Sequence, residues 1–215
     1  MSMIPEKPPF KLLDILYKKE FILFVVLVSI LIINSNISPY FLDLYNLIDS
    51  TFLFSEKAII ALTMTFVIIA RQIDLSVASI IAVSSCVLGY TTSLGYDTWL
   101  VISLTLLSGA ICGAFNGAII TKFAIPSIIV TIGTMSLFRG LAYSFLEDSY
   151  YNKFPKLVSN LGGGYLFGYI PYAFLTFIIL AIIFAFILHK TSVGKKIYSI
   201  GNNPDAAQYT GIAVD

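Results

Sequence analysis

The chain has 215 residues, of which 58% are hydrophobic and only 12% charged, and its mean hydropathy is +0.90. Soluble domains are about 25% charged, so this composition excludes an ordinary soluble domain and predicts an all-α, polytopic membrane protein. The net charge of +1, with no Lys- and Arg-rich block interleaved with aromatic residues, argues against nucleic acid as a partner and leaves membrane lipid as the expected surroundings.

Long apolar runs predict about six transmembrane helices after a polar, cytosolic arm at residues 1–20. The spans are expected at residues 21–33, 52–70, 73–92, 99–121, 126–146 and 170–188. A cleaved secretory signal is the alternative for the first run, but no small-x-small cleavage pattern follows it.

The connections between the spans differ in length and charge. Residues 40–50 contain aspartates without Lys or Arg and are expected outside, with Glu56 and Lys57 near the outer end of the second span. A tight break at residues 71–74 is expected to join the second span to the third. Residues 147–169 form a long external segment, where three consecutive glycines argue against a span and the apolar residues predict short elements on the membrane surface.

The distribution of the 13 Lys and Arg residues predicts the orientation. With six spans, the residues that fall inside are Lys7, Lys11, Lys18, Lys19, Arg71, Lys122, Lys190, Lys195 and Lys196. Only Lys153 and Lys156 fall outside. Both termini are therefore expected in the cytoplasm, and the chain is expected to be a multi-pass protein of a bacterial inner membrane.

No pattern in the sequence indicates catalysis, a metal site or a cofactor. The segment at residues 192–196 lacks the leading glycine and closing hydroxyl of a phosphate-binding loop, so any active transport by this chain requires an external motor. Cys86 and Cys112 lie in apolar spans and are interpreted as packing residues. The single histidine, His189, is expected at a membrane interface.

Polar residues inside the spans are the candidates for a translocation pathway or gate. Asp74 and Ser76 stand at the start of the third span, where they either cap the helix or form a hinge. Asn116 either forms an interhelical hydrogen bond or lines a pathway. Thr131 lies in the fifth span, and Arg139 in the same span either snorkels to the interface or serves transport.

Two further patterns have a structural interpretation. Gly109, Gly113 and Gly117 recur every four residues, which predicts close helix packing. Residues 189–215 form a polar cytosolic segment in which Asn203 and Gly211 are expected to bound a short helix. In that helix Pro204 suits the first position and Asp205 the positive end of the helix dipole. We interpret this segment as a docking element for another protein.

Four sequence blocks resemble the permease subunits of ribose-type monosaccharide importers of the ATP-binding-cassette class. These blocks occur in the family's order across nearly the whole chain, at residues 71–79 (RQIDLSVAS), 113–117 (GAFNG), 125–142 (IPSIIVTIGTMSLFRGLA) and 194–207 (GKKIYSIGNNPDAA). The resemblance implies a transport subunit without enzymatic activity of its own. It divides the chain into the arm, a permease domain at residues 21–188 and a coupling segment at residues 189–215.

The resemblance also implies the partners. They are a second permease subunit, identical or paralogous, a dimer of cytosolic ATPases and a sugar-binding protein outside the membrane. The implied contact with the ATPase is the segment that contains Asn203, Pro204, Asp205, Ala206, Ala207 and Gly211. The implied function is alternating-access import of a monosaccharide, with the external segment receiving the binding protein.

The sequence departs from the family pattern at two places. Gln72 and Ala78 replace two glycines, which implies a stiffer hinge. Family members also continue through further spans after the coupling segment, so a sequence ending at Asp215 is expected to be a fragment or a shortened, non-functional subunit. The alternatives are an ion-coupled secondary transporter, and a membrane enzyme using His189 or Arg139 with Asp74.

Overall fold

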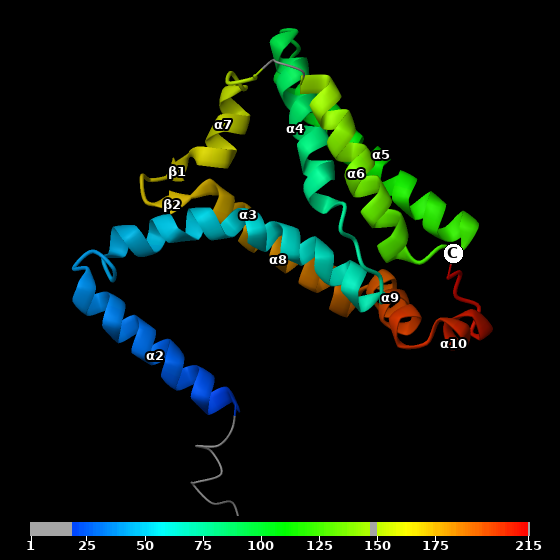
Figure 1. Cartoon of the computed structure of the whole chain (residues 1–215), viewed down its shortest axis with the longest axis horizontal. Helices are drawn as coiled ribbons and strands as arrows, with labels where there is room; N and C mark the ends of the chain where they lie inside the picture. The colour runs from blue at the N-terminus through cyan, green and yellow to red at the C-terminus, as the bar shows by residue number, and fades with distance from the viewer. Residues whose placement is uncertain (1–18, 147–149, 215) are drawn as a thin grey trace, which may run out of the picture. The chain divides into compact units, whose positions relative to one another are not determined.

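The computed structural model describes residues 19–146 and 150–214 (Figure 1). The predicted arm up to residue 18, the first three residues of the external segment and Asp215 lie outside this part. The contacts divide the chain into two compact units, Met1–Ser50 and Thr51–Asp215.

The first unit contains helix α2 (Lys19–Ile37) and the start of helix α3 (Leu44–Ile69). The side chains of Asn34 and Asn36 donate to carbonyl groups one turn earlier, which carries α2 through its polar end. The prediction that residues 40–50 form a connection is wrong in its second half. The Asp43 carboxylate accepts the Tyr45 backbone N–H at 3.2 Å, and α3 begins there.

The early start of α3 changes the position of its charged residues. Glu56 and Lys57 lie in the middle of α3, whereas they are near the outer end of the predicted span at residues 52–70, and their depth in a membrane stays a prediction. A charged side chain in the middle of an apolar helix is costly unless it faces protein or a water-filled cavity. Glu56 therefore requires an explanation that the sequence pattern did not supply.

The second unit is helical apart from one short β-hairpin. Its remaining helices are α4 (Val77–Ser93), α5 (Thr98–Phe123), α6 (Ser127–Leu146), α7 (Lys156–Gly163), α8 (Tyr172–Lys190), α9 (Ser192–Asn202) and α10 (Pro204–Tyr209). The hairpin pairs β1 (Tyr165–Leu166) with β2 (Ile170–Pro171). The structure is thus that of a polytopic α-helical membrane protein, as predicted.

Five helices in the described part of the chain, α2, α3, α5, α6 and α8, are long and apolar enough to cross a membrane. Helix α4 is apolar but has only 17 residues, or about 26 Å at 1.5 Å per residue. The hydrocarbon core of a bilayer is about 30 Å thick. Helix α4 alone is slightly shorter than this thickness, so the sixth crossing stays a prediction.

Helices α4, α5 and α6 pack against one another (Figure 1). Val101 of α5 is completely buried, and Val130 and Phe138 of α6 are almost completely buried. The Phe138 ring meets Phe115 of α5 edge to face at 6.2 Å between centroids. A Cβ atom at Gly109 would lie 3.2 Å from the Ser84 hydroxyl, so α5 approaches α4 closely there.

Helices α3 and α8 meet through aromatic rings. Phe54 pairs with Phe177 at 6.0 Å and Phe66 with Phe184 at 5.1 Å, both edge to face. The predicted short elements of the external segment are α7 and the hairpin, whose turn has positive φ at Phe167 and Gly168, as a type I′ turn requires.

Candidate functional site

The backbone leaves helical geometry between α3 and α4. Arg71 adopts a left-handed conformation with φ of 58°, and the N–H groups of Arg71 and Gln72 donate back to the carbonyls of Ile68 and Val67. This is a Schellman motif, which ends α3 sharply. The predicted break is present, but α4 begins at Val77 and not at Ile73, because side-chain hydrogen bonds hold residues 73–76 out of the helix.

A relay of hydrogen bonds links this break to α5. The Asn116 side-chain amide donates to the Ser76 hydroxyl at 2.8 Å, and that hydroxyl donates to the Asp74 carboxylate at 2.6 Å. The same carboxylate oxygen accepts the Ser76 backbone N–H at 2.8 Å. Ser76 is fully buried and Asn116 is 4% exposed. Hydrogen bonds in such an environment are strengthened by the low local dielectric, so the relay fixes the orientation of Asp74.

Helix α6 holds the other side of the break. The Ile73 backbone N–H donates to the Ser127 hydroxyl at 3.0 Å, and the Thr131 hydroxyl donates to the Ile73 carbonyl at 3.2 Å. Non-helical backbone at membrane depth is tolerated only where protein or water satisfies it. Ser127 and Thr131 provide that satisfaction, so the break is a built feature and not a frayed helix end.

Two buried polar atoms beside the relay have no partner among the described residues. They are the hydroxyl oxygen of Ser79, which is fully buried, and the carbonyl oxygen of the Asn116 side chain. Buried polar groups are normally hydrogen-bonded, and leaving one unpaired costs about 1–3 kcal/mol. The packing around the break is therefore incompletely satisfied, which suits a segment that rearranges.

The structure brings together four of the five residues predicted for the pathway. Asp74, Ser76 and Asn116 form the relay, and Thr131 holds Ile73. Arg139 is exposed on α6, two turns beyond Thr131, and takes no part in this cluster. Both interpretations of Arg139 stay open. The N-cap residue of α4 is Ser76 and not Asp74. The Asp74 carboxylate instead orients Ser76 by accepting its backbone N–H.

The predicted glycine stripe divides into two parts. Gly109 packs against α4, as expected. A Cβ atom at Gly113 or Gly117 would meet nothing within 4 Å, so these glycines do not pack against another helix in the described part of the chain. Close packing at these two positions stays a prediction.

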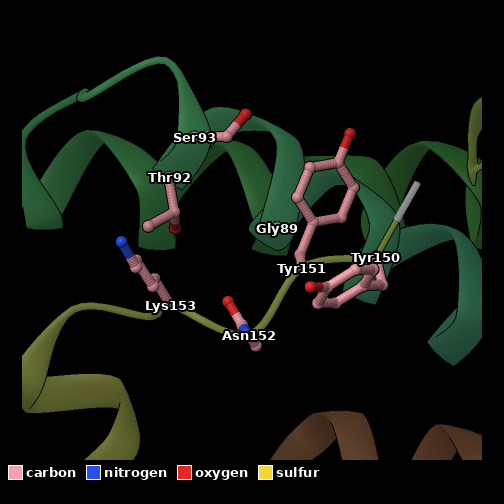
Figure 2. Close-up of a pocket in the computed structure, with 7 residues that line it drawn as sticks. All are labelled: Gly89, Thr92, Ser93, Tyr150, Tyr151, Asn152 and Lys153. Carbon is pink, nitrogen blue, oxygen red and sulfur yellow. The ribbon is translucent and has the colours of Figure 1, made fainter.

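A polar hollow of about 320 Å³ lies at the other end of α4. Figure 2 shows Lys153 and Asn152 of the segment before α7 opposite Thr92 and Ser93 of α4. Tyr151 anchors this segment, because its ring covers the bare backbone of Gly89. The beginning of the external segment is thereby attached to α4.

Residues 203–211 of the C-terminal segment have the local structure that the sequence predicts. The Asn203 side chain caps α10 by accepting the Ala206 N–H at 3.1 Å, Pro204 is the first helical residue, and Asp205 lies in the first turn. Gly211 has φ of +82° after the helix. Ala207 is buried, whereas Asp205 and Ala206 are exposed. An exposed, capped helix of this kind is suited to contact another protein.

Sequence reasoning missed helix α9, which connects α8 to α10. Its Gly194 lies against the carbonyl groups of Ile187 and Leu188, and its Gly201 lies against the carbonyl of Ile69 at the end of α3. The signal was present, since a glycine at each of these positions permits backbone contact that any side chain would prevent. Helix α9 therefore ties the C-terminal segment to the ends of α8 and α3.

The described residues contain no group of three or more His, Cys, Asp or Glu that could hold a metal ion. Cys86 and Cys112 are free thiols. The His189 Nδ1 atom lies 2.8 Å from the carbonyl oxygen of Ala185, one turn earlier in α8. His189 thus pairs with the backbone of its own helix and is not part of the relay.

Comparisons with known proteins give a consistent set of relatives. Residues 46–215 match the family described as branched-chain amino acid transport system / permease component. The ribose import permease protein RbsC of Haemophilus influenzae is 34% identical over 199 residues, or 89% of this chain. RbsC of Bacillus subtilis is 36% identical over 196 residues, also 89% of this chain. The autoinducer 2 import system permease protein LsrD of Klebsiella pneumoniae is 32% identical over 210 residues, or 91% of this chain.

In each of these three proteins the match covers 60% of the relative's length. The chain therefore spans less than two thirds of the curated relatives that it matches. No solved structure is significantly similar to it.

Proposed function

This chain belongs to the family of permease components of branched-chain amino acid transport systems, and from that membership we propose that it is the permease subunit of an ATP-binding-cassette importer for a monosaccharide. One observation carries the proposal. Two proteins named as ribose import permeases are 34% and 36% identical to this chain, and each match covers 89% of it. Its five long apolar helices support a multi-pass membrane protein, and its relatives among bacterial import permeases support the inner membrane.

The proposed importer has four kinds of component. This chain pairs with a second permease subunit, a dimer of cytosolic ATPases supplies the energy, and a binding protein delivers the sugar from outside. The given sequence contains no phosphate-binding loop, in keeping with a separate ATPase subunit.

In this scheme the break between α3 and α4 is the moving part of the permease. Discontinuous helices commonly form the substrate sites about which alternating-access transporters rearrange. Asp74, Ser76 and Asn116 hold the break in one arrangement through hydrogen bonds that can be exchanged for water or sugar hydroxyls. The unpaired Ser79 hydroxyl lowers the cost of such an exchange.

Helix α10 is the proposed contact with the ATPase. Asn203 and Gly211 define its ends, and its exposed face includes Asp205 and Ala206. Helix α9 links α10 to α8 and to the end of α3. A displacement of α10 by ATP-driven closure is thereby passed to the helix that precedes the break.

Uptake measurements test the proposal. Cells that produce the complete transporter containing this chain should accumulate radiolabelled ribose in an ATP-dependent manner that an uncoupler does not abolish while ATP is maintained. Accumulation of labelled leucine without ribose would replace the sugar by a branched-chain amino acid, the substrate in the family description. Uptake lost with the ion gradient alone would instead support a secondary transporter.

The predicted orientation has a separate test. A cysteine introduced at Asp205 should react with a membrane-impermeant maleimide only from the cytoplasmic side, and one introduced at Lys153 only from the outside. Labelling of the Asp205 position from outside would overturn both the topology and the coupling role.

A further inference from the structure

A widely open cavity of about 540 Å³ lies beside the break, and its lining includes two carboxylate side chains, of which that of Glu56 is exposed. Glu56 contributes from the middle of α3, together with Ile60 and Met64, one and two turns further along the same face. Asp74 contributes from the break. This volume falls within the range of about 300–1,000 Å³ that is typical of small-molecule sites.

Glu56 has no ion-pair partner among the described residues, and neighbouring Lys57 does not line the cavity. The Glu56 side chain is exposed, and a carboxylate on an apolar helix is costly unless it faces protein or water, so its place on the cavity wall points to a polar function there.

Asp74 reaches the same cavity in a fixed orientation. One of its carboxylate oxygens accepts both hydrogen bonds from Ser76, which Asn116 holds in turn. The other oxygen has no partner among the described residues. The buried relay therefore presents an acceptor whose position is set before any ligand arrives, and such preorganisation lowers the cost of binding.

The cavity also offers hydrogen-bond donors. Val77 and Ala78 line it at the first turn of α4, where their backbone N–H groups have no acceptor among the residues described. The first N–H groups of any helix lack an intrahelical partner. Free donors thus lie along one wall and free acceptors along another.

These groups select the chemistry of a ligand. The positive end of the α4 dipole disfavours a cation, and two carboxylates disfavour an anion. A hydroxyl group both donates and accepts hydrogen bonds, so it can pair with the N–H groups on one wall and with the carboxylates on the other. Ile60, Met64 and Ile81 add apolar surface, which suits the C–H faces of a compact neutral polyol.

We propose that Glu56 and Asp74, with the first N–H groups of α4, form the hydroxyl-binding section of the translocation pathway, where a neutral polyhydroxylated molecule is held as it crosses. This inference rests on the proposed function, and it adds to that function a substrate-contacting role for Glu56. Glu56 is the residue whose substitution isolates the site, since Asp74 also supports the break.

The test uses proteoliposomes with the complete transporter, ATP inside and a saturating concentration of the binding protein loaded with radiolabelled D-ribose outside. Glu56→Gln should lower the maximal uptake rate on the order of tenfold, because glutamine keeps nearly the shape of glutamate but lacks its charged hydrogen-bond acceptor. The half-saturating ribose concentration, which the binding protein sets, should not change. Glu56→Asp should recover part of the rate, and Lys57→Gln should transport at the unaltered rate.

A second variant guards against an effect on folding. Ile60→Trp narrows the cavity without removing a charge and should also slow uptake, while the ATPase rate without binding protein and the amount of assembled complex stay unchanged. If the unaltered transporter moves neither ribose nor any other monosaccharide, the proposed function fails. If it moves ribose and both Glu56→Gln and Ile60→Trp transport at the unaltered rate, the further inference alone is wrong.

Discussion

Replacing Ser76 by alanine tests the buried relay that holds the break. The substitution removes one hydrogen bond to the Asp74 carboxylate at 2.6 Å and one from the Asn116 amide at 2.8 Å. A hydrogen bond to a charged group contributes about 1.5–3 kcal/mol, and an unpaired buried amide costs about 1–3 kcal/mol. Because hydrogen bonds between membrane helices average only about 0.6 kcal/mol, we expect a total loss of about 2–3 kcal/mol.

Asn116→Leu should behave differently. It removes the bond to Ser76, but it also removes the side-chain carbonyl oxygen of Asn116 that is already buried without a partner. These two effects are similar in size and opposite in sign, so the free energy of unfolding should change by less than about 1 kcal/mol. In the double variant no buried amide is left unpaired, and Ser76→Ala should then cost only about 1–2 kcal/mol.

The measurement is a double-mutant cycle on the purified chain, with reversible unfolding in mixed micelles followed by circular dichroism. Ser136→Ala, at an exposed position on α6, is the control and should stay within about 0.5 kcal/mol of the unaltered chain. If the two single effects add in the double variant, Ser76 and Asn116 are not coupled and the relay is refuted.

Three further predictions concern glycines. In Gly89→Ala the new methyl carbon would lie 2.5–2.7 Å from atoms of the Tyr151 side chain, so that ring must leave α4 and trypsin should cleave the segment before α7 several-fold faster; an unchanged cleavage rate would contradict the contact. Gly201→Ala would overlap the carbonyl of Ile69 and should lower the free energy of unfolding by about 2 kcal/mol in a denaturation experiment, whereas an unchanged midpoint would show that α9 does not approach α3 there. Gly211→Ala imposes a side chain at φ of +82°, which costs about 1 kcal/mol, and should weaken copurification of the ATPase more than it weakens the fold; full copurification would argue against coupling through α10.

The local structure of residues 203–211 was predictable because its determinants are close in sequence. Asn203, Pro204 and Gly211 act on the backbone within one turn of themselves, through a cap, a preset φ and a left-handed conformation. The same is true of the apolar runs, whose length decides whether a helix can cross a bilayer.

The start of α4 was not predictable in the same way. The pattern at Asp74 and Ser76 is compatible with a helix from Ile73 onward. In the structure, hydrogen bonds from residues more than 50 positions away hold Ile73 out of the helix. Ser127 and Thr131 bind the backbone of Ile73 because α6 lies against the break, and no local pattern specifies that neighbour.

Amino-acid sequence alone determined that this chain is a bundle of membrane helices ending in a polar, capped segment, because hydrophobicity and backbone preference are properties of neighbouring residues. Tertiary structure decided which polar residues meet, since hydrogen bonds and cavities depend on distances that the chain sets only when its helices pack. Asn116 thus joins the break, Arg139 does not, and Glu56 lines a cavity beside Asp74.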